Sequence, residues 1–314
     1  MSDFTSRRNH MVDSQIAARG VRDRNVFGAM RAVPRELFVE AGFEEFAYED
    51  SPLPIGDEQT ISQPYIVALM IEAAEVGPGD HVLEVGTGSG YAAAVMSMIA
   101  DKVYTIERHQ PLAKAAGERF RKLDYINIDL RIGDGTKGWP ETAPFDAIIV
   151  AAGGPEAPQA LKEQLAIGGR LVIPVGEKMG HQSLLKITRM GEGDYEEEDL
   201  GSVRFVPLVG EQGRIEDGRR SATTHVPGKA SGKSLPDMIA EAAEGAVSLM
   251  ATCLRLTQLS PKRRDVRPRG TATRPMRSSG VRGRSGGRRD DVPGRSGCAG
   301  WHGLRRTFVA SSSA

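Results

Sequence analysis

The stretch Val82-Leu-Glu-Val-Gly-Thr-Gly-Ser-Gly-Tyr91 decides the fold, because a short apolar strand breaks there into a glycine loop. Glycine permits a tight turn and a close approach of ligand to backbone, and the helix that follows presents free N–H groups. The spacing is Gly-x-Gly-x-Gly, which differs from the dinucleotide fingerprint Gly-x-Gly-x-x-Gly. The loop by itself indicates a nucleoside-bearing cofactor only weakly, since a plain strand-to-helix turn has the same glycines.

Short apolar runs alternate with helix-like stretches from residue 81 onward. We expect strands at 81–85, 102–107, 128–132, 145–151 and 170–175, with helices between them at 90–100, 110–123 and 156–166. This rhythm is typical of a buried, mostly parallel sheet with helices on both faces. Two later runs, at 183–188 and 202–208, are predicted to form an antiparallel pair around an acidic turn at 191–199.

The segment before the loop has a different pattern. Residues 11–46 carry spaced apolar positions that predict short amphipathic helices, interrupted at Pro34. Residues 51–56 contain two prolines and must be extended or turning, because a residue before proline avoids the helical region. A further helix is expected at 65–74, directly after Pro64.

Two acidic side chains stand at the C-terminal ends of the next predicted strands. Glu107 ends the second strand, where a carboxylate can accept hydrogen bonds from both ribose hydroxyls. Asp134 follows the third strand and suits an exocyclic adenine amino group. Ligands of open α/β sheets bind at this edge of the sheet. The pattern predicts an S-adenosylmethionine site formed by Glu84, Gly86, Thr87, Gly88, Ser89, Gly90, Glu107, Arg108, Asp134 and Gly135.

Over about residues 8–212 the chain resembles the protein-L-isoaspartate (D-aspartate) O-methyltransferase family. The blocks that carry the resemblance include Met11-Val-Asp-Ser-Gln15, Val33-Pro-Arg-Glu-Leu-Phe38, Gln59-Thr-Ile-Ser-Gln-Pro-Tyr65, the glycine loop and Val203-Arg-Phe-Val-Pro-Leu208. Many methyltransferases share the glycine loop, whereas the Thr-Ile-Ser and Phe-Val-Pro-Leu segments are far more specific. In two places the chain departs from the family pattern: Gly153-Gly154 replaces an alanine-rich run, and Asp57-Glu58 replaces a glycine.

The resemblance implies a Rossmann-like, S-adenosylmethionine-dependent methyltransferase fold and a substrate, the α-carboxylate of an isoaspartyl or D-aspartyl residue in a damaged protein. It makes Ser62 the active-site serine, which we expect to orient this carboxylate, and it places Thr60 and Ile61 around the methyl group. Val206, Pro207 and Leu208 are expected to lie beside the substrate peptide. A carboxylate with a pKa of about 4 is already ionised at neutral pH, so alignment and exclusion of water carry the catalysis. The methyl ester then closes to a succinimide, which hydrolyses to aspartate and isoaspartate.

Composition bounds the class of protein. Of the 314 residues, 39% are hydrophobic, which is enough for a packed core, and no apolar run reaches the roughly 18 residues of a membrane span. The polar N-terminus lacks the apolar core of a signal peptide. Cys253 and Cys298 are the only cysteines in the sequence and both come late. These features predict a cytoplasmic protein without a membrane segment; no metal site and no oligomer are expected, so we predict a monomer.

The last part of the chain differs from the rest. Residues 251–314 contain 14 Arg and one Lys against three Asp, a net charge of +12, whereas the first 250 residues carry −12. We therefore predict a methyltransferase domain at 1–212, a linker at 213–250 with a possible helix from Ser234, and a disordered Arg/Gly/Ser-rich tail at 251–314.

Two interpretations of the tail stay open. It could bind nucleic acid, although Trp301 and Phe308 are its only aromatic residues. Alternatively, it is an out-of-frame product, because it lacks Glu, Asn, Ile and Tyr, and Ser234–Glu244 resembles the start of an erythromycin-esterase-like domain. We favour a truncated or frameshifted fusion and expect no nucleic-acid partner. The rival functions are a methyltransferase of the same fold that acts on a small molecule, and a cofactor-fold protein with an RNA-binding tail.

Overall fold

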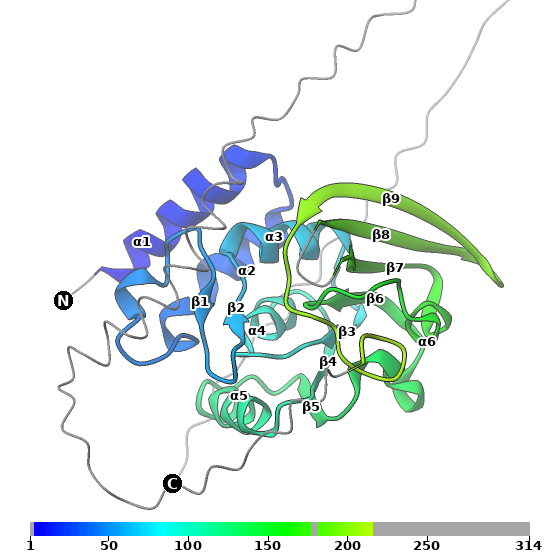
Figure 1. Ribbon diagram of the computed structural model, residues 1–314. Coiled ribbons are helices and arrows are strands. Elements are labelled where there is room, and N and C mark those ends of the chain that lie inside the picture. Colours follow the sequence, from blue (N-terminus) through cyan, green and yellow to red (C-terminus); the bar gives the residue numbers. More distant parts are fainter. Residues whose placement is uncertain (1–2, 178–180, 216–314) are drawn as a thin grey trace, which may run out of the picture. The chain divides into compact units, whose positions relative to one another are not determined.

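The computed structural model describes residues 3–177 and 181–215. Its centre is a seven-stranded sheet with the strand order β5-β4-β3-β6-β7-β8-β9 (Figure 1). Five strands are mutually parallel: β3 (His81–Val85), β4 (Lys102–Glu107), β5 (Ile128–Ile132), β6 (Phe145–Val150) and β7 (Leu165–Gly176). The predicted mostly parallel sheet is therefore confirmed, and its order reverses beside β3, because β4 lies on one side of β3 and β6 on the other.

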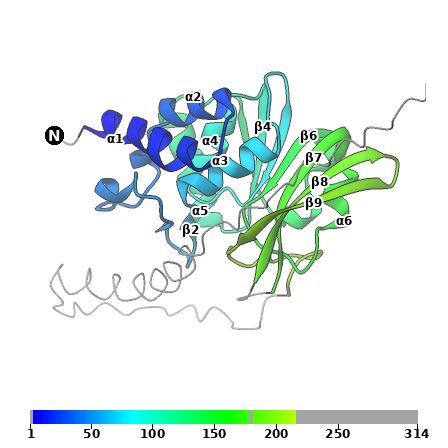
Figure 2. The same ribbon diagram turned by 90° about the horizontal axis from the view of Figure 1, so that it is seen from above.

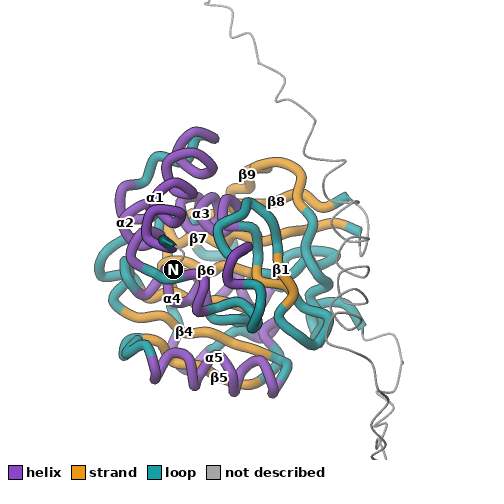
Figure 3. Tube along the Cα trace, turned by 90° about the vertical axis from the view of Figure 1, so that its left-hand side faces the viewer, coloured by secondary structure: helices purple, strands orange, loops and turns teal. Residues whose placement is uncertain are grey.

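Helices cover both faces of this sheet (Figures 2 and 3). One face carries α2 (Arg24–Ala32), α3 (Pro64–Ala73), α4 (Tyr91–Ser97) and α5 (Gln110–Lys122), with α1 (Phe4–His10) further out. The other face carries α6 (Gln159–Glu163). Successive strand residues point to opposite faces, so Val82 packs in the core under the larger helical layer while Leu83 and Val85 pack in the core on the side of α6.

The N-terminal part contains the short helices that the sequence predicts. After α1 the chain continues as a π-helix, Met11–Ile16, and then as α2, which begins where the Asp23 side chain accepts hydrogen bonds from two backbone N–H groups. Pro34 follows α2 and leads into a 3₁₀ helix, Arg35–Leu37. The chain then forms a small hairpin from β1 (Leu53–Pro54) and β2 (Thr60–Ile61). Pro64 begins α3, as its fixed φ favours.

The C-terminal antiparallel pair is present, but its second strand was placed wrongly. β8 (Gln182–Gly191) pairs with β9 (Asp194–Val203), so the acidic stretch predicted as a turn is itself a strand, and the turn is confined to Glu192-Gly193. β9 is one of the two edge strands of the sheet, and its charged side chains discourage further strand pairing. Its exposed positions therefore show no apolar alternation. Beyond Val203 the chain leaves the sheet, and Pro207 pairs with Gly153.

The fold continues through the backbone hydrogen bond from Arg214 N–H to the Leu208 carbonyl. The predicted linker beyond residue 215, its possible helix and the tail at 251–314 lie outside the described residues. In the part of the chain that the structure describes, no helix combines the length and apolar character needed to cross a membrane.

Candidate functional site

A cavity of about 290 Å³ lies at the C-terminal ends of β3 and β4, beside the reversal of strand order. Open α/β sheets bind ligands at such a point. Its wall combines segments that are distant in sequence: 57–62, 84–92, 106–109 and 206–209. All the predicted site residues line this cavity except Gly90 and Asp134. The glycine loop and the Thr-Ile-Ser loop are therefore walls of one space.

The glycine loop has the backbone conformation that its composition predicts. Gly86, Gly88 and Gly90 have φ angles of 98°, 52° and 88°, in the region that side chains with a Cβ rarely adopt. A Cβ on Gly90 would also meet the Phe120 ring at 2.7 Å. Gly90 therefore lets the start of α4 pack closely on α5, which explains why it lies outside the cavity wall.

Glu107 is held in the cavity wall by the backbone around it. Its side chain is buried, with Oε2 accepting a hydrogen bond from Gly88 N–H at 2.8 Å and Oε1 accepting one from His109 N–H at 2.9 Å. Each carboxylate oxygen has a second lone pair. The carboxylate is therefore fixed at the end of β4 and can still accept hydrogen bonds from a ligand that carries hydroxyl groups.

Glu84 is a buried acid at the centre of a hydroxyl chain. Thr105 Oγ1 is hydrogen-bonded to Glu84 Oε2 at 2.5 Å and to the Thr87 hydroxyl at 2.6 Å, and in the second of these bonds either hydroxyl can be the donor. Burial raises the pKa of Glu84 to about 8, and the nearby Glu107 charge acts in the same direction. The carboxyl group is therefore protonated at neutral pH, and it ties the glycine loop to β3 and β4.

Asp134 follows the end of β5 but does not line the cavity in this structure, so its expected contact with the adenine amino group stays a prediction. Its Oδ1 accepts hydrogen bonds from the N–H and hydroxyl of Thr136, and its Oδ2 accepts one from Glu211 N–H at 2.8 Å. Burial alone would raise the pKa of Asp134, but these hydrogen bonds outweigh it and lower the pKa. A Cβ on Gly210 would lie 2.0 Å from Asp134 Oδ1, so the segment around Gly210 covers the carboxylate. Its neighbour Gly135 does line the cavity.

Two further loops line the cavity, and they carry the residues predicted to bind the substrate. Thr60, Ile61 and Ser62 form β2 and its end, and the Ser62 carbonyl accepts a hydrogen bond from Arg35 Nη2 at 2.8 Å. A second contact holds the next residue, Gln63, whose side-chain amide donates to the Asp50 carboxylate at 2.6 Å. These two hydrogen bonds, from Arg35 and to Asp50, therefore fix the loop at Ser62 and Gln63.

Val206, Pro207 and Leu208 form the opposing loop. Gly153 N–H donates to the Val206 carbonyl at 2.7 Å, and Leu208 N–H donates to the Gly153 carbonyl at 2.9 Å. A Cβ on Gly153 would approach the buried Gln182 amide to 2.6 Å. Gly153, which departs from the family pattern, therefore leaves room for the Gln182 amide beside this loop.

The other departure, Asp57-Glu58, shapes the mouth of the same cavity. Both residues have positive φ, 48° and 57°, and both line the cavity. L-residues with side chains adopt this conformation at a cost, and glutamate is less tolerant of it than aspartate. In the turn before the Thr-Ile-Ser loop, Asp57 and Glu58 therefore adopt a backbone conformation that favours glycine.

Sequence reasoning missed several buried polar residues that hold the site. Arg35, Thr105 and Gln182 are buried, and each contacts a loop of the cavity or the strand that precedes it. Their partners lie 27, 21 and 23 residues away in the chain, so no local pattern predicts the contacts. The sequence feature that could have indicated two of these residues is a polar side chain within an apolar run. Thr105 lies in such a run in Lys102–Glu107, and Arg35 lies in the Val33–Phe38 block.

The side chains of the cavity fit S-adenosylmethionine. The methyl donor is a sulfonium cation, and the wall carries the acidic side chains of Asp57, Glu58 and Glu107, with Arg108 as its one arginine or lysine among the described residues. The glycine loop and the fixed Glu107 carboxylate supply the backbone approach and the hydroxyl acceptor that a nucleoside needs. A second cavity of about 370 Å³, between α6 and residues 211–213, is lined by neither the glycine loop nor Glu107.

Comparison with known proteins gives the same identification. The family described as Protein-L-isoaspartate(D-aspartate) O-methyltransferase (PCMT) matches residues 6–213. The protein-L-isoaspartate O-methyltransferase of Brucella anthropi is 57% identical over 210 residues, which cover 67% of this chain and 96% of that protein. The enzyme of the same name from Pelotomaculum thermopropionicum is 58% identical over 206 residues, covering 66% of this chain and 90% of that protein.

Solved structures agree with the sequence matches. A protein-L-isoaspartate O-methyltransferase superposes with a TM-score of 0.60 at 28% identity, covering 65% of this chain and 67% of its own. A putative member from Plasmodium falciparum, in complex with S-adenosyl-L-homocysteine, gives a TM-score of 0.57 at 26% identity and covers 64% of this chain and 98% of its own. The matched residues include every segment of the cavity wall, and the predicted fold is confirmed. The chain belongs to the protein-L-isoaspartate (D-aspartate) O-methyltransferase family.

Proposed function

We propose that this chain transfers the methyl group of S-adenosylmethionine to the free carboxylate of damaged aspartyl residues in proteins: the α-carboxylate of L-isoaspartyl residues and the side-chain carboxylate of D-aspartyl residues. The observation that carries the proposal is the shared cavity: the Thr60–Ser62 loop and Val206–Leu208 face the glycine loop and Glu107 across one space. The product ester closes to a succinimide, whose hydrolysis returns part of the material to aspartate. The enzyme therefore acts as a protein repair methyltransferase.

The chemistry asks little of acid or base groups. The methyl donor supplies an electrophilic carbon with a neutral thioether leaving group, and the substrate carboxylate is already ionised above its pKa of about 4. What this chain contributes is alignment of the carboxylate with the methyl carbon and exclusion of water. In this proposal Ser62 orients the carboxylate, with Thr60 and Ile61 beside it. On the cofactor side, Glu107 accepts hydrogen bonds from the ribose hydroxyls, and the glycine loop lets the backbone approach the nucleoside.

The direct test compares an isoaspartyl peptide with its normal aspartyl twin. Full-length protein is incubated with each peptide and S-adenosylmethionine labelled in the methyl group, and base-labile methyl ester is measured. We expect ester only on the isoaspartyl peptide. Equal methylation of both peptides, or methylation of small carboxylic acids in preference to the peptide, would favour the small-molecule alternative.

For the remainder of the chain we infer a truncated or frameshifted fusion with an erythromycin-esterase-like domain. The support is the sequence Ser234–Glu244 and the composition of 251–314. Translating the other reading frames of the gene downstream of codon 245 tests it, and the lack of an esterase-like frame would contradict it. Cytoplasmic localisation, a monomeric state and the lack of a nucleic-acid partner also stay predictions, which fractionation, light scattering and an RNA-binding assay can check.

A further inference from the structure

Arg35 is a buried cation directly behind the loop that carries Ser62. Its side chain is fully buried, with Nε donating to the Ala47 carbonyl at 2.8 Å and Nη2 donating to the Ser62 carbonyl at 2.8 Å. The guanidinium carbon lies 4.7 Å from the centre of the Tyr91 ring. Tyr91 is the first residue of α4, immediately after the glycine loop, and lines the cavity. One side chain therefore contacts the substrate loop and the start of the cofactor helix.

These contacts depend on the shape of the arginine side chain. A planar guanidinium can donate to two carbonyls at once and still present its face to an aromatic ring, whereas a lysine ammonium is a point donor. Burial lowers the pKa of Arg35 to about 10, with Tyr91 acting in the opposite direction, so the group stays charged at neutral pH. A buried charge is costly unless its surroundings compensate it. The Arg35 charge is met by the Ala47 and Ser62 carbonyls and by the face of the Tyr91 ring, and of these residues Ser62 and Tyr91 line the cavity. The third nitrogen, Nη1, is buried without a hydrogen-bond partner in the described residues.

We propose that Arg35 is a positioning residue for methyl transfer: it fixes the Ser62 backbone, and with it the Ser62 hydroxyl, at a set distance from the glycine loop. The inference rests on the proposed function. It adds to that function a residue that does not line the cavity and acts only through Ser62 and Tyr91.

The reaction makes this placement consequential. Carboxylate oxygen, methyl carbon and sulfur must stand in line, and displacement of a positioning group by about 1 Å can cost on the order of a hundredfold in rate. The reaction also neutralises charge, because a carboxylate and a sulfonium become an ester and a thioether. A cation that contacted the carboxylate directly would stabilise the reactants more than the transition state. Arg35 instead directs two of its N–H groups at carbonyls, and so can order the loop without contacting the reacting atoms.

The test is a double-mutant cycle between Arg35→Lys and Ser62→Ala on full-length protein. The readouts are kcat and KM for an isoaspartyl peptide, binding of S-adenosyl-L-homocysteine, and the midpoint of thermal unfolding. We expect Arg35→Lys to lower kcat by about ten- to a hundredfold while S-adenosyl-L-homocysteine binding is retained. When Ser62→Ala is already present, Arg35→Lys should lower kcat little further, because the hydroxyl that Arg35 positions is absent.

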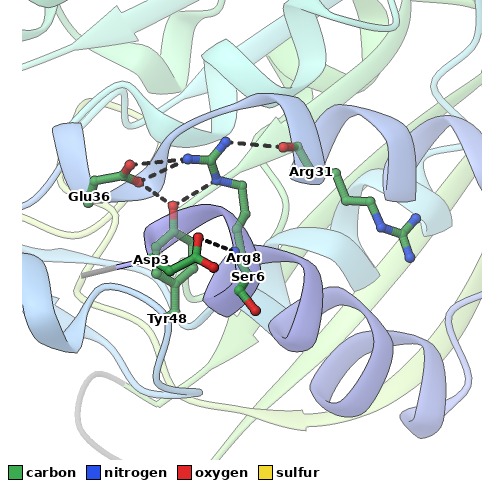
Figure 4. Close-up of polar contacts among 6 residues, drawn as sticks. All are labelled: Asp3, Ser6, Arg8, Arg31, Glu36 and Tyr48. Carbon is green, nitrogen blue, oxygen red and sulfur yellow. Dashed lines mark hydrogen bonds and ion pairs between the residues drawn. The ribbon is translucent and has the colours of Figure 1, made fainter. Parts of the chain in front are cut away.

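The matched control is Arg8→Lys. Arg8 is another guanidinium of the N-terminal layer, where it donates to Glu36, the Tyr48 hydroxyl and the Arg31 carbonyl (Figure 4). It has no hydrogen bond to the Ser62 loop among the described residues. Arg8→Lys should lower the unfolding midpoint and leave kcat unchanged, which separates loss of stability from loss of positioning.

Other outcomes overturn the proposal. Additive losses in the cycle would show that Arg35 does not act through Ser62, and parallel loss of ligand binding and activity would indicate a general structural role. If Arg35→Lys does not fold, Arg35→Gln, which keeps one donor and removes the buried charge, is measured in the same way. Failure of both variants to fold would assign Arg35 to stability alone. Inactivity of the unmodified protein on the peptide is a separate result, since it refutes the proposed function.

Discussion

Ser62 lines the cavity that the glycine loop and Glu107 also line, and its proposed role is testable by removal of the hydroxyl alone. We predict that Ser62→Ala lowers kcat for an isoaspartyl peptide by about ten- to a hundredfold, the range expected for a lost hydrogen bond to a charged group. Binding of S-adenosylmethionine, measured by calorimetry, should stay near normal because the glycine loop is untouched. Ser14→Ala, which removes an exposed hydroxyl on the N-terminal helix, is the control. Equal loss of turnover and cofactor binding would contradict the assignment.

Glu84 gives a prediction about pH and stability. Burial raises its pKa in the folded protein to about 8, above the ordinary value of 4.5, so the folded state keeps a proton that the unfolded chain has lost. The stability contributed by the protonated form is therefore complete below about pH 4.5 and is lost as the pH rises toward about 8, by an amount on the order of a few kcal/mol.

The variant Glu84→Gln tests this dependence, because its neutral amide does not ionise. Its unfolding midpoint should fall less between pH 5 and pH 8 than that of the unmodified protein. The difference in the pH dependence of the free energy of unfolding should correspond to about one proton released on unfolding. Glu118→Gln, on the exposed side of α5, is the control. Parallel curves for Glu84→Gln and the unmodified protein would show that Glu84 is ionised in the folded state.

At the level of single residues, the sequence predicts the parts of the site that local patterns encode. The glycine loop and Glu107 stand at a strand end, and they line the cavity as expected. Asp134 satisfies the same local rule but lies outside the cavity wall, held there by Thr136 and by Glu211, the second of which lies 77 residues away. Arg35 shows the converse, since its role depends on carbonyls at Ala47 and Ser62. The spacing of residues along the sequence could not predict contacts between segments that only the folded structure brings together.

Secondary-structure elements show the same division. Strands β3, β4 and β5 have the predicted bounds, because a strand within a parallel sheet reads as a short apolar run between turns. β9 was missed, because an edge strand exposed to solvent carries acidic residues and resembles a turn. β5 is the other edge of the sheet, and it was predicted because Ile128, Leu130 and Ile132 alternate with polar residues. A strand with apolar positions was therefore predictable from the sequence, and an acidic edge strand without them was not.

The turn before β2 carries a prediction at this scale. Glu58 has a φ of 57° without the freedom of glycine, so Glu58→Gly should relieve about 1 kcal/mol of backbone strain and lose part of it to the entropy of the unfolded chain. We expect a net gain of about 0.5 kcal/mol in the free energy of unfolding, measured by urea denaturation. The matched control is Glu49→Gly in a neighbouring turn where φ is not positive, and it should destabilise. A loss in both variants would show that the Glu58 side chain stabilises the turn.

The whole molecule yields the last prediction, which concerns how much of the chain the activity needs. Every segment of the cavity wall lies between Asp57 and Val209, and the last segment is fastened by the hydrogen bonds of Glu211 to Asp134 and of Arg214 to the Leu208 carbonyl. A chain ending at residue 215 keeps all of these contacts. We expect it to methylate an isoaspartyl peptide with the kcat and KM of the full-length protein. A chain ending at residue 205 lacks Val206–Leu208 and uncovers Asp134, and it should lose activity through a raised KM for the peptide. If the 215-residue chain folds by circular dichroism and binds S-adenosyl-L-homocysteine but no longer turns over, the remainder of the sequence contributes to substrate binding, and the assignment of function to residues 1–215 alone is wrong.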